Sequence, residues 1–166
     1  MPTPNQFAAA LGKICRYGGR AAFWSVLLHS FVVADLVEPQ YRLWALTHDI
    51  VERQTGDVNT NFKSAEMRHA EDRLLDEAYD RLEIPRMTHA GHRAVKVADI
   101  RSRAGEIWSG VGDTALRKTY PTRDREAERL TLKYFRKYKP ADTINPKGRA
   151  VKEFCRRFKA YKKELA

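Results

Sequence analysis

Apolar residues recur every three or four positions through most of this chain, and no segment alternates with the two-residue period of a strand. Glycine and proline residues, which favour turns and end helices, separate these amphipathic segments. The pattern therefore predicts an all-α protein. The expected helices cover residues 5–14, 25–37, 41–53, 64–82, 90–108, 124–138 and 147–165.

The segment 25–37 is apolar on almost every side, which is typical of a helix buried at the centre of a domain. His29 lies within it. A single histidine in such a helix is usually a packed core residue, and it becomes a candidate metal ligand only if other ligands lie nearby.

The segment 41–53 starts apolar and runs into polar residues that include the adjacent pair His48 and Asp49. Burying a histidine and carboxylates without partners is costly, and a metal ion would satisfy them together. Adjacent side chains point in different directions inside a regular helix. We therefore expect the helix to loosen at this pair, so that both side chains reach one ion.

The candidate ligands are His29, His48, Asp49 and Asp99. Nitrogen and oxygen ligands of this kind suit a divalent transition ion, such as manganese, cobalt, iron, nickel or zinc, better than calcium. An ion of this type lowers the pKa of water toward neutrality and so prepares a nucleophile for hydrolysis.

Two further carboxylates follow the ligand pair. Glu52 stands four residues after His48 and faces the same side of a helix, where a general acid or base would act. The alternative for Glu52 is a salt bridge with Arg53 or Arg16. Asp57 follows a glycine, which can turn it toward a polar group of a substrate.

Arg16 and Tyr17 precede the glycine pair at 18–19, in a segment that also includes Arg20. Backbone N–H groups of a glycine turn and a guanidinium both suit phosphate oxygens, so this loop is a candidate phosphate site. Tyr17 and Trp24 are candidates for stacking on a base. The alternative for both aromatic rings is packing in the core.

The net charge of +10 is concentrated in the last third of the chain. Residues 1–100 carry 12 basic and 13 acidic side chains, whereas residues 101–166 carry 19 and 8. This asymmetry indicates an anionic partner for the C-terminal part, such as a nucleotide, a nucleic acid or an acidic protein face, or else a solvated basic surface.

The 166 residues suit one domain, and no apolar run approaches the roughly 20 residues of a membrane-spanning helix. The first residues lack the basic and apolar regions of a secretory signal. Cys15 and Cys155 match no zinc spacing, so we expect free thiols. These features predict a cytoplasmic protein that does not interact with membranes.

The order of His29, His48-Asp49 and Asp99 resembles the H…HD…D ligand pattern of the HD superfamily of metal-dependent phosphohydrolases. The segments 15–19, 23–30, 48–58 and 95–99 look like the bacterial 5′-deoxynucleotidase group and its phage relatives, which include dATP triphosphohydrolases. The resemblance covers roughly residues 7–108. Relatives often carry a proline where this chain has Asn61.

The resemblance implies a compact HD-domain helical bundle over residues 1–110, with two extra basic helices in residues 111–166 packed on the same domain. It implies that the four candidate ligands bind cobalt, zinc, manganese or possibly magnesium, and that Glu52 acts on the attacking water. Asp57 would lie near the sugar, and Arg16, Lys63 and Lys96 would face the phosphate. The alternative for these cations is simple solvation.

The resulting prediction is a hydrolase of deoxynucleotides, either a dNTP triphosphohydrolase or a dNMP 5′-nucleotidase, in the cytoplasm or, for a phage protein, in that of the host. We also expect a homo-oligomer, either a dimer or a hexamer. Two alternatives stay open: a nucleic-acid-binding module that uses the basic C-terminal helices, which we favour less, and a hydrolase of a signalling nucleotide.

Overall fold

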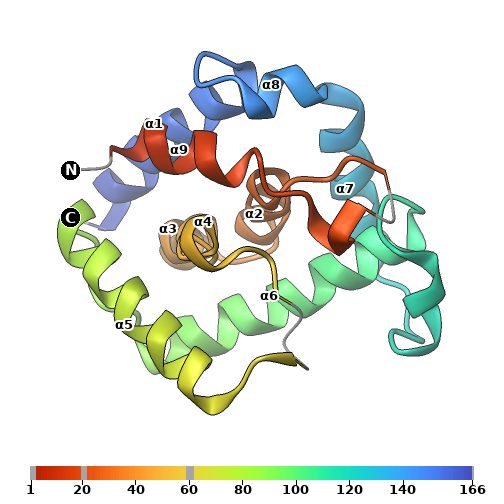
Figure 1. The fold of residues 1–166 in the computed structure, drawn as a ribbon, viewed down its shortest axis with the longest axis horizontal. Helices are drawn as coiled ribbons and strands as arrows, with labels where there is room; N and C mark the ends of the chain where they lie inside the picture. Colours follow the sequence, from red (N-terminus) through yellow and green to blue (C-terminus); the bar gives the residue numbers. More distant parts are fainter. Residues whose placement is uncertain (1–2, 20–21, 59–61, 166) are drawn as a thin grey trace.

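The computed structural model describes residues 3–19, 22–58 and 62–165, so Arg20 and Asn61 lie outside the described part. The described residues form helices and no strand, which confirms the predicted all-α class (Figure 1). The α-helices are α1 (Pro4–Leu11), α2 (Val26–Asp35), α3 (Arg42–Thr47), α4 (Glu52–Thr55), α5 (Ala65–Leu82), α6 (His89–Trp108), α7 (Arg125–Lys137), α8 (Pro140–Ile144) and α9 (Arg149–Leu165). Short 3-10 helices are η1 (Arg16–Gly19), η2 (Pro39–Tyr41) and η4 (Thr114–Lys118).

Most of the long helices begin at a residue whose side chain caps them. Ser25, Ser64, Thr88 and Asp124 each accept a hydrogen bond from the backbone N–H three residues further on. Such a bond satisfies one of the free N–H groups at a helix start. Helices α5, α6 and α7 consequently begin and end within one residue of the predicted positions.

The single helix predicted over 41–53 is wrong. Helix α3 ends at Thr47, and α4 begins only at Glu52. Between them, the backbone makes three-residue turns, with Ile50 N–H bonded to Thr47 O and Glu52 N–H bonded to Asp49 O. The loosening expected at His48 and Asp49 is therefore present, and it extends to a complete break between two helices.

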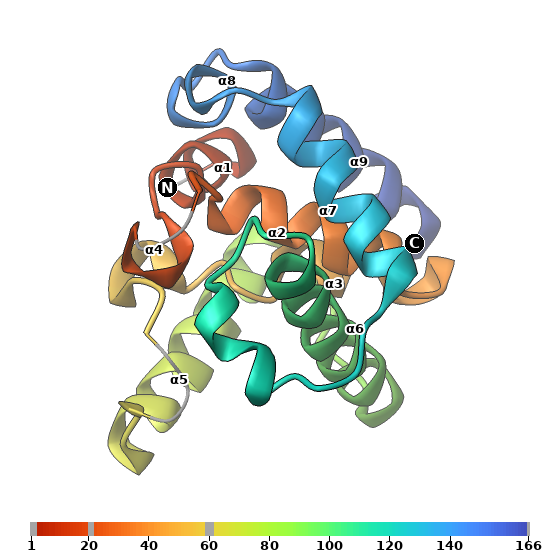
Figure 2. The ribbon, with the colours of Figure 1, turned by 90° about the vertical axis from the view of Figure 1, so that its right-hand side faces the viewer.

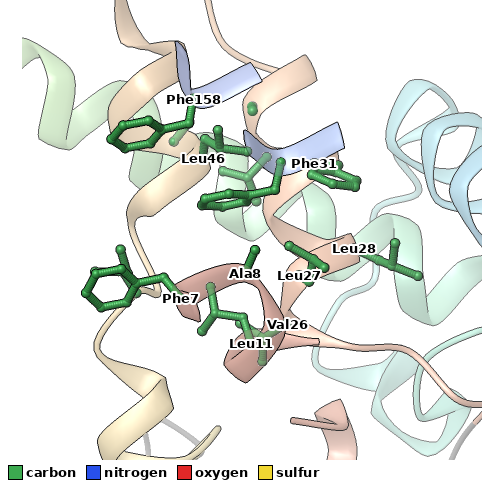
Figure 3. Close-up of a cluster of buried hydrophobic side chains, with 14 of the residues drawn as sticks. Phe7, Ala8, Leu11, Val26, Leu27, Leu28, Phe31, Leu46 and Phe158 are labelled. Carbon is green, nitrogen blue, oxygen red and sulfur yellow. The ribbon is translucent and has the colours of Figure 1, made fainter. Parts of the chain in front are cut away.

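Helix α2 lies at the centre of the fold, with the other helices arranged around it (Figures 1 and 2). Its residues Val26 to Ala34 are all buried. Phe31 of α2 meets Phe7 of α1, Leu46 of α3 and Phe158 of α9 in one hydrophobic cluster (Figure 3). A functional side chain on α2 is therefore held by packing on every side.

The basic C-terminal helices contribute to this same core. Tyr134 of α7 and Phe154 and Phe158 of α9 are buried in the cluster that includes α2. A partly buried ion pair adds to this packing, because Arg157 Nη1 lies 2.8 Å from Asp35 Oδ1, while Tyr134 donates a hydrogen bond to the same carboxylate. Residues 125–165 thus help to fix α2.

Within the described ranges, no helix combines the length and apolar character needed to cross a membrane. The two cysteines, Cys15 and Cys155, are free thiols, as the sequence predicts.

Replacing Arg157 by leucine would leave Asp35 without its counter-charge. We expect the free energy of unfolding, measured by urea denaturation, to fall by about 2 kcal/mol, between the values for exposed and for fully buried ion pairs. Arg156→Leu is the matched control, because that neighbouring side chain is 67% exposed and pairs with Glu153 at the surface. We expect Arg156→Leu to lower the free energy of unfolding by less than about 1 kcal/mol. Equal losses in both variants would contradict a role for Arg157 in joining α9 to α2.

Candidate metal centre

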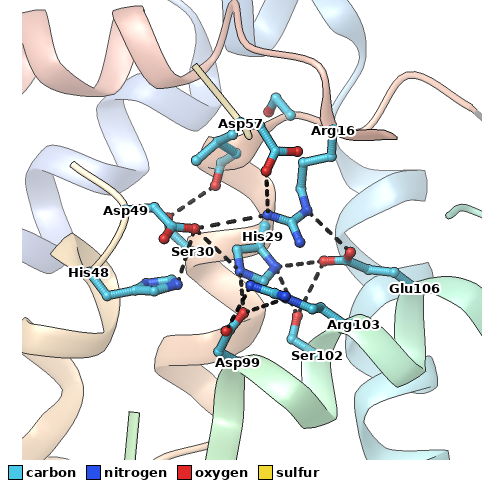
Figure 4. Close-up of polar contacts among 12 residues, drawn as sticks. Arg16, His29, Ser30, His48, Asp49, Asp57, Asp99, Ser102, Arg103 and Glu106 are labelled. Atoms are coloured by element: carbon cyan, nitrogen blue, oxygen red, sulfur yellow. Dashed lines mark hydrogen bonds and ion pairs between the residues drawn. The ribbon is translucent and has the colours of Figure 1, made fainter. Parts of the chain in front are cut away.

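The four candidate ligands meet at one point, although they come from three separate parts of the chain (Figure 4). His29 lies in the middle of α2, His48 and Asp49 lie in the turn after α3, and Asp99 lies in the middle of α6. His29 Nε2 is 3.5 Å from Asp49 Oδ2 and 3.3 Å from Asp99 Oδ1. His48 Nε2 is 3.1 Å from Asp49 Oδ2.

Both imidazole rings are oriented by a hydrogen bond at the nitrogen that faces away from this point. His29 Nδ1 lies 2.6 Å from Glu106 Oε1, and His48 Nδ1 lies 2.8 Å from the backbone oxygen of Ala45. Because both partners are acceptors, each Nδ1 is placed to donate a hydrogen bond, and a neutral ring would then present the lone pair of Nε2 to this point. A metal-binding histidine commonly donates its other ring N–H to a carboxylate or a backbone oxygen in this way.

The two Nε2 atoms are buried and have no hydrogen-bond partner among the described residues. The nearest acceptors are the carboxylate oxygens of Asp49 and Asp99, 3.1 to 3.5 Å away, so an ion bound among these groups would engage both nitrogens. The ligand atoms of His29, His48 and Asp99 lie within 4.8 Å of one another. Two ligands that each lie about 2.1 Å from one ion are roughly 3.0 to 3.4 Å apart. The distances of 3.1 to 3.5 Å between the Nε2 atoms and the carboxylate oxygens are close to this spacing, so this group could hold a divalent metal ion.

The two aspartates are charged at neutral pH. Burial opposes their ionisation, but His48 and His29 outweigh it at Asp49 and hold the pKa of that carboxyl well below its usual range. At Asp99, contacts with His29 and Arg103 outweigh burial and lower the pKa in the same way. His29, His48 and Asp99 therefore form a group that could hold a divalent ion, and the Asp49 carboxylate lies beside both imidazoles.

Glu106 is a central residue that the sequence analysis missed. It is fully buried, and in addition to His29 it accepts hydrogen bonds from Arg16 Nε at 3.2 Å, from the Tyr17 hydroxyl and from Ser102. A signal for it was present, because Glu106 follows Asp99 by seven residues, which is two helical turns on the same face of α6. One carboxylate thus positions both a ligand and the predicted phosphate-binding arginine.

The predicted phosphate loop brings Arg16 into the centre. The Arg16 side chain is 4% exposed, and its Nη1 lies 3.9 Å from Asp49 Oδ2 and 3.8 Å from Asp57 Oδ1. Tyr17 and Gly18 adopt positive φ values of 61° and 58°. Such a backbone is unusual for tyrosine, and the hydrogen bond from its hydroxyl to Glu106 helps to hold it.

Glu52 is buried beside the ligands, and its Oε2 has no hydrogen-bond partner among the described residues. Burial, together with the nearby carboxylates of Asp49 and Asp57, raises the pKa of Glu52 well above its usual value. A carboxyl group with a raised pKa is a better proton acceptor near neutral pH than an ordinary surface glutamate.

The remaining predicted residues occupy different surroundings. Lys63 Nζ pairs with Glu71 at 2.8 Å and lies near enough to Glu52 to favour its ionised form. Lys96 is largely exposed, with Nζ 3.7 Å from Asp99 Oδ2. Trp24 is completely buried in the core, so neither face of its ring is open to a base, and the packing alternative fits this residue.

Arg103 is a second residue that the sequence analysis missed. Its guanidinium lies 3.0 Å from Asp99 Oδ2, one helical turn away on α6. It neutralises the outer side of this ligand and fixes its orientation.

A comparison with protein-family models and with curated proteins finds no match to this chain. The assignment of a function therefore depends on the geometry of the centre and on the residues of its pattern.

Removing one ligand nitrogen tests the metal centre. We expect wild-type protein, stripped of metal and dialysed against manganese, cobalt or zinc, to retain one ion per chain by elemental analysis. His48→Ala should lower the metal affinity by more than the roughly 10- to 100-fold that follows loss of a residue hydrogen-bonded to a ligand. His92→Ala, an exposed histidine on α6, is the control and should retain the ion. Equal metal content in all three proteins would contradict the site.

The charge of Glu106 predicts a pH dependence of stability. Arg16 and His29 outweigh burial and lower the pKa of Glu106 to about 2. Since the pKa in the unfolded chain is about 4.3, the stabilisation is complete above that pH and is lost as the pH falls toward the folded-state value. In the metal-free protein, the stability difference between wild type and Glu106→Gln should therefore shrink from about pH 5 to pH 2. If the free energies of unfolding of wild type and Glu106→Gln, measured in urea, differed by the same amount from pH 5 to pH 2, the lowered pKa of Glu106 would be contradicted.

Proposed function

We propose that this protein is a metal-dependent phosphohydrolase of nucleotides, acting on deoxynucleotides. The observation that carries the proposal is the pair of buried, unpartnered Nε2 atoms of His29 and His48, which point at the carboxylates of Asp49 and Asp99. The resemblance of the pattern H…HD…D to the HD superfamily supports the same conclusion, since these are the four residues that it matches.

The four ligands would hold a divalent ion, which supplies a Lewis acid that lowers the pKa of water and offsets the charge of a phosphoryl group. Glu52 is suited to accept the proton of the attacking water at its unpartnered Oε2, because its environment raises its proton affinity. Glu106 keeps His29 in one tautomer and one orientation throughout.

Arg16 is the best candidate for binding the phosphate. Its contacts with Asp49 and Asp57, at 3.9 and 3.8 Å, are ion-pair distances longer than a hydrogen bond. The terminal nitrogens of this side chain can therefore also donate to phosphate oxygens, while its Nε stays bonded to Glu106. Lys63 and Lys96 would add positive charge from two other sides.

The substrate can be a deoxynucleoside monophosphate, which releases phosphate, or a triphosphate, which releases tripolyphosphate. The basic excess of the C-terminal third does not favour the longer anion, because no side chain of α7 or α9 takes part in the contacts of the centre given above. The choice between the two substrates, the preference for deoxynucleotides and the homo-oligomeric state stay predictions.

Hydrolysis of a nucleotide panel tests the proposal. NMPs, dNMPs, NTPs and dNTPs would be incubated with protein that was first chelated and then supplied with manganese, cobalt, zinc or magnesium. Phosphate, pyrophosphate and tripolyphosphate would be measured separately. We expect metal-dependent release from deoxynucleotides, and a loss of about 10²- to 10⁴-fold in kcat for Glu52→Gln if this residue transfers the proton.

Two variants provide the controls. Asp49→Ala removes a ligand and should abolish turnover with every metal. Asp72→Ala removes an exposed carboxylate of α5 and should leave turnover unchanged. No release with any metal, or full activity in Asp49→Ala, would overturn the proposal.

A further inference from the structure

The outward face of α9 carries a row of basic side chains. Its exposed positions follow a spacing of three or four residues, so they lie on one side of the helix. They are Arg149, Lys152, Arg156, Lys159 and Lys163. The exposed acidic residue of this helix, Glu164, stands at its C-terminal end.

Helix α7 carries a second row on its own outward face. The exposed residues from its first turn to its last are Arg125, Arg129, Lys133, Arg136 and Lys137, together with Glu126 at the start. Glu126 lies 2.7 Å from Arg101 of α6, so its charge is already balanced there. The buried side of α7 faces α2 and α6, which turns the basic row away from the core.

Two hydrogen bonds link the helices that carry the two rows. Arg157 of α9 donates a hydrogen bond of 2.6 Å to the Tyr134 hydroxyl of α7. Arg149, at the start of α9, donates to the backbone oxygen of Lys137 at 3.0 Å. The C-terminal basic surface is defined here as Arg129, Lys133, Arg136, Lys152, Lys159 and Lys163.

These six side chains form no ion pair with a described acidic group, whereas two exposed arginines of α9 do. Arg149 pairs with Asp142 and Arg156 pairs with Glu153. Like charges one helical turn apart, as in Arg129 and Lys133, repel one another and destabilise the helix. An anionic partner would remove this repulsion.

The length of the surface indicates an extended anion. The row on α9 spans roughly 21 Å at 1.5 Å per residue, whereas one strand of DNA carries a phosphate about every 3.4 Å along the axis. A single nucleotide is too short to contact the whole row. A membrane is disfavoured, because interfacial helices insert large apolar side chains, and the exposed large apolar residues of the described chain are Phe62, Val97, Ile100 and Ile144, outside both helices.

We propose that the C-terminal basic surface binds the phosphodiester backbone of a nucleic acid, independently of the metal centre. Binding is expected to be insensitive to base sequence, since lysine and arginine contacts to phosphate carry no sequence information. This proposal does not depend on the hydrolase activity, because the surface shares no side chain with the metal centre.

The test measures binding of fluorescent 30-nucleotide single-stranded DNA, duplex DNA and RNA between 50 and 200 mM salt. The three probes separate the possible sources of the phosphate backbone. For duplex DNA, the logarithm of the affinity should fall linearly with the logarithm of salt, by about 0.9 for each phosphate contact. In the triple variant Lys152→Gln/Lys159→Gln/Lys163→Gln, this slope should decrease by about 2 to 3, and the affinity at 50 mM salt should fall at least about 10-fold.

The matched control removes three cations elsewhere, in Arg73→Gln/Arg81→Gln/Arg93→Gln on α5 and α6. Both triple variants have the same net charge, so only the position of the charge differs, and the control should bind like wild type. Asp49→Ala should also bind like wild type even if its hydrolase activity is lost. Bound DNA should protect Lys152, Lys159 and Lys163 of the wild type from acetylation.

Four results would overturn the proposal. The first is no binding of any probe at 50 mM salt, and the second is an equal loss of nucleic-acid affinity in the two triple variants. The third is tighter binding to anionic phospholipid vesicles than to nucleic acid. The fourth is self-association in sedimentation that disappears in the Lys152→Gln/Lys159→Gln/Lys163→Gln variant while nucleic-acid binding stays unchanged.

Discussion

Two imidazoles and two carboxylates meet inside this protein, and their mutual charge balance is the constraint on which the centre depends. Asp49 and Asp99 stay ionised although they are buried, and the Nε2 atoms of His29 and His48 have no hydrogen-bond partner among the described residues. Because burying such groups without a cation is expensive, their convergence needs positive charge beyond the part that Arg16 and Arg103 supply. A divalent ion would provide it at the point where all four side chains meet.

The rest of the fold keeps these side chains in place. Helix α2 holds His29 within a core to which α1, α3 and α9 all contribute. The break between α3 and α4 lets His48 and Asp49 point the same way, which a continuous helix would prevent. Glu106 then orients His29 and Arg16 together. Thus the centre is shaped by one buried helix, one turn and one outer carboxylate.

The spacing of apolar and polar residues along the chain predicted much of this arrangement. The 3.6-residue period gave the class and the boundaries of the long helices, and the clustering of His48, Asp49 and Glu52 gave the position of the centre. The complete break after Thr47 was not predicted, because the apolar pattern continues through residues 41–53 and indicates only a loosening at His48 and Asp49. Glu106 was missed, since its importance comes from contacts with residues about 80 to 90 positions away. Likewise, the burial of Trp24 depends on how the helices pack, which the sequence pattern does not show.

The position of an ion tests the central claim most directly. Crystals soaked with manganese or cobalt would be measured at the absorption edge of the metal, so that anomalous scattering locates each ion. The account predicts one strong peak within about 2.0 to 2.3 Å of His29 Nε2 and His48 Nε2, with oxygens of Asp49 and Asp99 as further ligands. A crystal without a peak at this point, or with its strongest peak at other residues, would contradict it.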